Sequence, residues 1–265
     1  MPDLYRQTES AILERDPTRK CELTRQLSKA WESGDLTTGK LSAILPIDDP
    51  GRPRRPPLVD PRRLQRRSFA SEAGRNRLLH AFAHIEFNAI NIALDAVYRF
   101  RKMPRRFVSD WLQVATEEAK HFQMLAAELQ QRRSYYGEFE AHRGLWDMVC
   151  KTRDNLLHRM ALVPRVMEAR GLDVTPAMIT RFAQFGDDSA VSILQAIYRD
   201  EIGHVRIGNY WYRKVCEEQD LEPEATFREL IDRYMAGKLR GPFNWAARIE
   251  AGFAAPELEA LERIG

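Results

Sequence analysis

Paired cysteines and long apolar runs are both missing from this 265-residue sequence. Its three cysteines, Cys21, Cys150 and Cys216, show no paired spacing. A disulfide framework or a cysteine zinc site is therefore not expected, and a reducing cytoplasm fits. No stretch holds ~18 uninterrupted apolar residues, so we expect no transmembrane helix and no membrane partner. The first residues have no apolar core, so we also expect no secretory signal and a cytoplasmic location.

An excess of one charge is also missing. The net charge is only +3, from 41 Lys and Arg against 38 Asp and Glu. A balance this mild does not require a nucleic-acid partner. The length allows either one large domain or a domain with extensions.

What the sequence does contain is a repeated pattern of carboxylates and histidines. Glu-x-x-His occurs at 118–121 and again at 201–204, and a further glutamate precedes each copy, Glu86 and Glu168. Residues three apart share one face of a helix, so each copy directs a carboxylate and an imidazole to the same place. Both copies lie on stretches whose apolar residues recur with the period of a helix.

The spacing of these residues is nearly the same in the two halves. The upstream glutamate lies 32 residues before its Glu-x-x-His in the first half and 33 residues before it in the second. The midpoints fall beside Met103-Pro104 and Gly186-Asp187, where helices are expected to stop. If each half folds as an antiparallel helical hairpin, its ligands lie level, roughly 16 residues or about 24 Å from the turn. Two such hairpins predict a four-helix bundle with six ligands at one level.

Three helices of this bundle are expected over the apolar repeats at about 75–101, 104–133 and 188–218. The remaining helix begins near Gly144 and is expected to be irregular. Pro164 should bend it one turn before Glu168, and the segment 171–176 should interrupt it again. The irregularity is either a simple break or a feature that shapes a pocket.

Further side chains near the two motifs are candidates for supporting roles. Glu117 and Asp200 each lie four residues before a motif histidine, where they either accept the second N–H of a metal-bound imidazole or remain solvated. Tyr198 is a candidate for electron or radical transfer, with a packed core tyrosine as the alternative. Gly203 and Gly208 each cost a helix about 1 kcal/mol relative to alanine. They either allow close helix approach or leave room over the metals.

Four carboxylates and two imidazoles indicate which metals would bind. Zinc prefers tetrahedral sites rich in nitrogen or sulfur, whereas this set suits two harder ions. Two irons are the first expectation, with Fe/Mn or Mn/Mn as alternatives, because four negative charges balance two divalent cations in a dry core. A metal-free bundle with a satisfied polar network is the alternative interpretation.

With these positions identified, residues 75–218 resemble the ferritin-like superfamily of di-iron carboxylate proteins. The repeat is similar to that of bacterioferritins, rubrerythrins, ribonucleotide reductase small subunits and bacterial monooxygenases. The whole chain, including Arg-Asp-Glu-Ile-Gly-His and Gly-Pro-Phe-Asn, looks like a bacterial ferritin-like family with no assigned function. A more distant similarity is to the tRNA-hydroxylating di-iron enzymes. The resemblance implies metal binding by Glu86, Glu118, His121, Glu168, Glu201 and His204; Glu117 could replace Glu118 only if the helix rotated by about 100°.

The expected fold is all-α, a ferritin-like four-helix bundle with extensions at both ends. Residues 1–70 are predicted as N-terminal helices and an arm packed on the bundle, 71–220 as the bundle and 221–265 as a C-terminal extension. The stretch 50–67 carries five prolines and seven arginines, so it cannot be helical throughout. It is either an extended arm with solvated arginines or an arm that contacts phosphates, for example those of RNA.

Three functions remain open from the sequence. The first is an O2-activating oxygenase or oxidase, which would act on a small-molecule or nucleoside-type substrate and need an external electron donor. The second is iron handling, as a ferroxidase or in peroxide detoxification; the sequence leaves a homo-oligomer open for either function. The third is a non-catalytic interaction module stabilised by metal. Kinship of fold does not decide among them.

Overall fold

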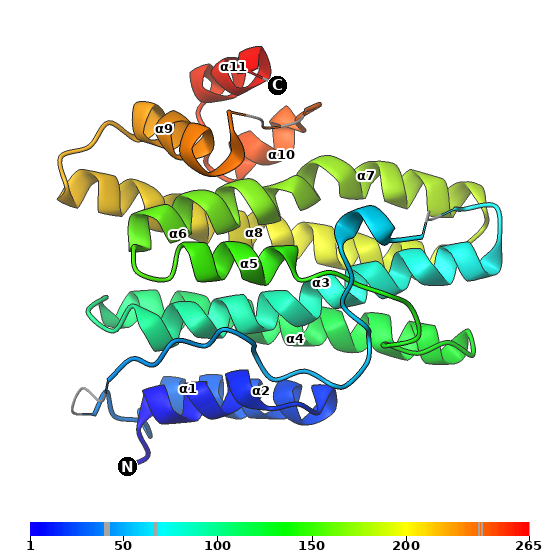
Figure 1. The fold of residues 1–265 in the computed structure, drawn as a ribbon, viewed down its shortest axis with the longest axis horizontal. Coiled ribbons are helices and arrows are strands. Elements are labelled where there is room, and N and C mark those ends of the chain that lie inside the picture. Colours follow the sequence, from blue (N-terminus) through cyan, green and yellow to red (C-terminus); the bar gives the residue numbers. More distant parts are fainter. Residues whose placement is uncertain (40–42, 66–67, 238, 240, 265) are drawn as a thin grey trace. The chain divides into compact units, whose positions relative to one another are not determined.

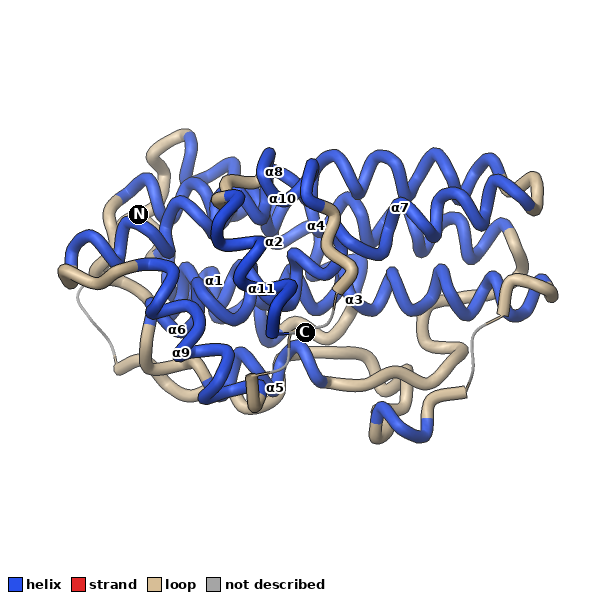
Figure 2. Tube along the Cα trace, turned by 90° about the horizontal axis from the view of Figure 1, so that it is seen from above, coloured by secondary structure: helices blue, strands red, loops and turns tan. Residues whose placement is uncertain are grey.

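The computed structural model describes residues 1–39, 43–65, 68–237, 239 and 241–264. Within these ranges every regular element is a helix (Figures 1 and 2), which confirms the predicted all-α class. The chain divides into two compact units, Met1–Cys150 and Lys151–Gly265. The domain limits expected at 70 and 220 stay a prediction.

The centre of the first unit is a hairpin of two long helices, α3 (Glu72–Arg99) and α4 (Arg105–Gln131). Ser71 starts α3 by accepting a hydrogen bond from the Gly74 N–H. The turn between the helices falls at the predicted Met103-Pro104. The apolar residues that recur at helical intervals in both helices are buried, among them Leu79, Ala93, Trp111 and Val114, which fixes the face that each helix presents to its partner.

Two shorter helices cover this hairpin in Figure 1, α1 (Leu4–Leu13) against α3 and α2 (Pro17–Glu32) against α4. Asp16 caps α2 through the Arg19 N–H, and Pro17 stands at the first helical position. Of the apolar residues that follow, Leu36 and Ile47 are buried, whereas Ile44 and Leu45 are exposed; Leu41 lies outside the described residues.

The arginine-rich arm runs in an extended form, with one short 3-10 turn, η1 (Pro61–Arg63). It is anchored to the loop after α4, because the Val59 N–H donates to the Ala141 carbonyl and the Ala141 N–H donates to the Pro57 carbonyl. The arginines at 54, 55, 62 and 63 are exposed, and Arg66 and Arg67 lie outside the described residues. The expectation of no continuous helix is confirmed. Helix α5 (Gly144–Lys151) follows.

The second unit is built on α7 (Ala169–Gln184) and α8 (Asp188–Glu218), which pack together. The turn between them falls at the predicted Gly186, whose φ of +67° suits glycine. Before α7 come α6 (Leu156–Leu162) and a π-helical segment, η2 (Val163–Glu168). After α8 come three shorter helices, α9 (Pro223–Met235), α10 (Trp245–Glu250) and α11 (Ala255–Ile264).

The prediction of one helix from Gly144 onward is wrong in two respects. The helix stops after Lys151 and restarts at Leu156, where the Asn155 side chain accepts the His158 N–H at 3.1 Å. The interruption predicted at 171–176 does not occur, because α7 runs through Pro176. Proline cannot donate to the Leu172 carbonyl, and the amide of Asn244 donates to that oxygen instead, at 3.2 Å.

Candidate metal centre

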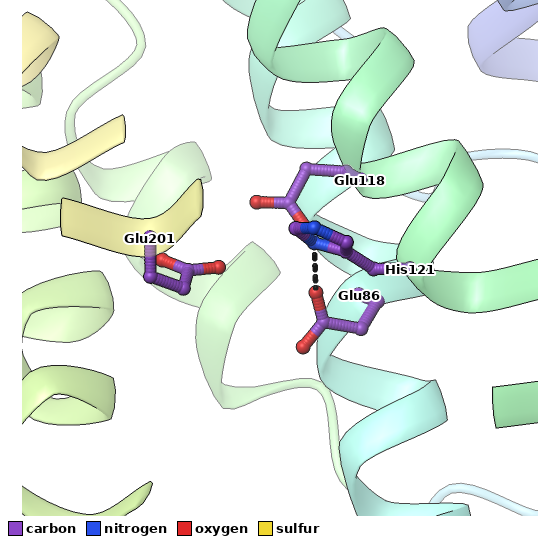
Figure 3. Close-up of side chains that lie close together, drawn as sticks. All are labelled: Glu86, Glu118, His121 and Glu201. Carbon is purple, nitrogen blue, oxygen red and sulfur yellow. Dashed lines mark hydrogen bonds and ion pairs between the residues drawn. The ribbon is translucent and has the colours of Figure 1, made fainter. Parts of the chain in front are cut away.

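The first unit brings three of the predicted ligands together in its core. Glu86 on α3 and the Glu118–His121 pair on α4 face each other across the hairpin, because the turn places residues 32 positions apart at the same level (Figure 3). One ligand atom of each lies within 4.8 Å of the others. The Nδ1 atom of His121 lies 3.2 Å from Glu86 Oε2 and 3.4 Å from Glu118 Oε2.

All three side chains are buried, and burial changes their acidity. Burial and the neighbouring Glu118 carboxylate raise the pKa of Glu86 well above its usual range. Burial alone would lower the pKa of His121, but hydrogen bonds to the Glu118 and Glu86 carboxylates outweigh it and raise that pKa to about 11. The cluster therefore holds two acids against one base, and it favours a positive charge at the position between them.

This donor set fits a metal ion. Oxygen and imidazole donors suit iron or manganese, and a cation at Nδ1 would replace the proton that the imidazole carries. The apolar neighbours along the same face, Ala83, Ile90 and Leu125 among them, are fully buried and exclude water. A dry shell of this kind strengthens the attraction between a cation and the carboxylates. A buried group of glutamates and a histidine able to bind metal is therefore present.

The second unit repeats the local geometry of the motif. On α8, His204 Nδ1 lies 3.6 Å from Glu201 Oε1, so the same imidazole nitrogen faces the carboxylate one turn earlier as in α4. His204 is buried and Glu201 is half-buried. Glu168, also half-buried, is the last residue of η2 and thus lies on irregular helix, as the sequence predicted. That all six residues bind metal stays a prediction.

Pro164 and Gly208 explain how the π-helical segment fits in its unit. Pro164 lacks the N–H that a regular α-helix needs, and the segment widens by one residue per turn there. A Cβ on Gly208 of α8 would overlap the Pro164 ring, so glycine permits this close approach. A Cβ on Gly203 would meet nothing within 4 Å. The sequence-based expectation of close helix approach is therefore confirmed for Gly208.

Arg165, which the sequence analysis missed, fixes the same segment from its other side. Its guanidinium is fully buried and donates to Asn209 Oδ1 at 2.8 Å and to the Glu257 carboxylate. Three aromatic rings enclose it, with centroids 4.2 to 4.8 Å away: Tyr212, Phe227 and Phe253. The available signal was a lone arginine inside the apolar run 160–166, which requires a buried partner.

The supporting residues occupy different surroundings. Glu117 Oε1 accepts a hydrogen bond from Gln113 Nε2 at 3.0 Å on the exposed part of α4. Asp200 is half-buried on α8. The Tyr198 hydroxyl accepts from the Asn244 amide at 2.9 Å, and burial raises the pKa of Tyr198. Their roles beside a metal stay predictions.

Among the described residues, no helix has both the length and the hydropathy that a membrane span requires.

Comparison with known proteins places the chain in a family. The family described as "Protein of unknown function (DUF455)" matches residues 13–259. An "Uncharacterized protein" of Haemophilus influenzae is 43% identical over 270 residues, which cover 98% of this chain and 94% of that protein. No solved structure matches. Because the match extends over nearly the whole chain, the protein belongs to the DUF455 family.

Proposed function

We propose that the chain is a di-metal carboxylate protein whose two half-sites form one centre for two iron ions, or for Fe/Mn or Mn/Mn. The half-sites are Glu86, Glu118 and His121 in the first unit and Glu168, Glu201 and His204 in the second. The observation that carries the proposal is the buried cluster of the first unit, in which the Glu86 and Glu118 carboxylates both face the Nδ1 atom of His121. The matched spacing in the sequence and the repeated His–Glu geometry on α8 support a second half of the same kind.

The residues of the first half-site would each do a definable task. Glu86 and Glu118 would bind as carboxylates, so metal uptake removes the proton that burial favours on Glu86. His121 would bind through Nδ1, the atom that already faces both acids. The apolar residues around them exclude bulk water. When bound, an iron pair supplies oxidation chemistry with O2, and we propose that the protein directs it to an organic substrate as an oxidase or oxygenase.

Metal stoichiometry tests the ligand assignment. We expect about two metal ions per wild-type chain after anaerobic loading with Fe(II), with proton release measured in weakly buffered solution at pH 7. The double variants Glu118→Ala/His121→Ala and Glu201→Ala/His204→Ala each remove both ligands of one Glu-x-x-His motif, and so two of the three residues of that half-site. Asp110→Ala is the control, because it removes a carboxylate from the same helix that pairs with Arg106 and is not among the candidate ligands.

The pattern of losses separates one shared centre from two independent ones. If the half-sites form one centre, each double variant loses the spectroscopic signature of a coupled metal pair, and the control keeps it. Loss of one metal with an unchanged spectrum at the other would contradict the shared centre. Two metals retained in either double variant would contradict the ligand assignment.

Exposure of the loaded protein to O2 tests the reaction class. Oxygenase or oxidase chemistry predicts that O2 uptake stops after the bound metal is oxidised unless a reductant is supplied. Continued oxidation of excess Fe(II) with mineral formation would instead establish iron handling. A single tightly held zinc would refute the di-iron proposal.

A further inference from the structure

The arginine-rich arm follows a fixed path across the first unit over residues 51–63. The Gly51 N–H donates to the Ile12 carbonyl at 2.9 Å, and a Cβ on Gly51 would overlap a carbonyl at the end of α1, so glycine permits this close approach. Farther along, Pro56 is buried, and the hydrogen bonds with Ala141 described above hold the next residues. Prolines restrict the backbone between these anchors. The segment is therefore ordered without a partner, and binding one would cost little backbone entropy.

Four arginine side chains of this segment are exposed, Arg54, Arg55, Arg62 and Arg63. No described residue forms a hydrogen bond or an ion pair with these four guanidinium groups. The described fold therefore does not use their charge. A guanidinium is always charged, and its planar fork of N–H donors matches the oxygens of a phosphate group. A partner that carries several phosphates is the kind that such a segment fits.

A groove of about 660 Å³ lies at the beginning of the segment. Arg15, from the loop after α1, and Arg52 and Arg54, from the arm, line it together with Leu13. The Leu13 side chain is 48% exposed and adds apolar surface. The groove thus extends the row of guanidinium groups to a second element of the first unit.

An exposed aromatic ring lies close to the arginines. Gly137 packs against the arm, because a Cβ added to it would lie 3.1 Å from the Arg55 side chain. Tyr135, two residues earlier in the same loop, is 49% exposed, and its Cα lies within about 7 Å of the Gly137 Cα. Arginines that follow a phosphate backbone and an aromatic ring that stacks on a base together bind single strands.

The acidic side chains near the segment have other contacts. Asp49 lines the groove, but its Oδ1 lies 3.8 Å from Arg52 Nε. Asp60 accepts a backbone N–H at 2.8 Å and so starts η1. On the neighbouring loop, Glu138 accepts the Ser134 hydroxyl. Positive charge therefore prevails along the segment, which favours an anionic partner.

We propose that residues 51–63 and Tyr135 form a binding surface for single-stranded nucleic acid. The exposed arginines contact phosphates along the strand, and Tyr135 stacks on one base. A single strand offers its base faces to the ring, whereas a duplex keeps them within the stack. Stacking tolerates every base, so we expect little sequence preference. The proposal does not depend on the metal centre.

Fluorescence anisotropy of the full chain with a labelled oligouridine of about 12 nucleotides tests the proposal. Four phosphate contacts predict a slope of about −3 in the logarithm of the binding constant against the logarithm of salt concentration, measured between about 50 and 200 mM. Arg54→Gln/Arg55→Gln and Arg62→Gln/Arg63→Gln should each reduce the slope to about −1.4, because each removes two contacts. Tyr135→Ala should weaken binding about tenfold with the slope unchanged, whereas Tyr135→Phe keeps the ring and should bind like wild type.

Arg19→Gln/Arg106→Gln is the matched control, because it removes the same charge from outside the proposed surface. Arg19 pairs with Glu22 at 3.1 Å on α2, and Arg106 pairs with Asp110 at 3.7 Å on α4. The control should bind within about twofold of wild type, with the same slope. Circular dichroism checks the fold of every variant, and should one arm variant unfold, the other decides.

Several results would overturn the proposal. Absence of binding at the lowest salt, a slope near zero, or equal losses in the arm and control variants would each do so. A duplex that binds as tightly as the single strand would remove the assignment to single strands. Heparin that binds as tightly as the oligonucleotide, with Tyr135→Ala equal to wild type for both, would establish a general polyanion surface in its place.

Discussion

Arg165→Met should destabilise the second unit strongly, although the substitution keeps an apolar side chain of similar length. The guanidinium is fully buried and bonded to the Glu257 carboxylate, which is itself only 3% exposed. Removing the arginine leaves that carboxylate buried without its main partner. Breaking a buried ion pair in this way costs about 3–5 kcal/mol.

The structure places the expected cost at the lower end of that range. Arg213 Nη2 lies 3.5 Å from Glu257 Oε2, and because the Arg213 side chain is 40% exposed it can move closer. Methionine also packs well against the aromatic rings that enclose the guanidinium. We therefore expect a loss of about 3 kcal/mol in the free energy of unfolding, or roughly 10 °C in the melting temperature of a unit of this size.

The double variant Arg165→Met/Glu257→Leu provides the internal control. It removes both charges and leaves an apolar cluster with Asn209, so its stability should lie within about 1 kcal/mol of wild type. Hydrogen exchange resolved by peptide is the appropriate measurement, because the chain has two compact units that need not unfold together. Protection should fall in η2 and the adjoining helices of the single variant.

Two results would contradict this account of Arg165. A single variant with a loss below about 1 kcal/mol would mean that the buried pair contributes little. Additive losses in the double variant would mean that the guanidinium acts by packing and not through Glu257.

Two further predictions concern single positions in each unit. Gly208→Ala should cost about 1–3 kcal/mol by overlap with Pro164, whereas the matched Gly203→Ala should gain about 0.5–1 kcal/mol, and thermal unfolding distinguishes them. Burial lowers the pKa of Lys20 to about 7, against about 10.4 in an unfolded chain, so the unfolded state binds more protons between these values. The free energy of unfolding of wild type relative to Lys20→Met should therefore rise from pH 7 to pH 9 in urea titrations. A flat difference would mean that the ammonium's hydrogen bonds, including one to Asn91 Oδ1 at 2.7 Å, offset its burial.

The sequence predicted those parts of the fold that depend on neighbouring residues. The apolar repeats located α3, α4 and α8 to within a few residues, because the period of a helix fixes which side chains share a face. The two turns were found because proline and glycine restrict the backbone locally. The approach of Glu86 to the Glu118–His121 pair followed from the length of the hairpin alone.

The predictions that failed concern features of the fold that depend on residues distant in the sequence. The path of α7 through Pro176 relies on the Asn244 amide, which comes from a segment about 70 residues later. The burial of Arg165 relies on Phe227, Phe253 and Glu257, all from the C-terminal extension. Nothing near Pro176 or Arg165 in the sequence identifies these partners. Local signals therefore indicated a break and left the arginine unexplained.

The contrast between two polar pairs on α3 bears on whether the glutamate cluster is a structural polar core. Asp95 is fully buried, and Arg99 one turn later neutralises it at 2.9 Å with a guanidinium that carries a permanent charge. Glu86, on the same helix, is also buried, yet the charges that act on its pKa come from another carboxylate, Glu118, and a titratable imidazole, His121. A core selected only for stability would pair the buried carboxylate with an arginine, as α3 does for Asp95 and Arg99, or would replace it by an apolar residue. A site that must exchange its positive charge for a metal ion instead requires a partner that can lose its proton, and histidine meets that requirement.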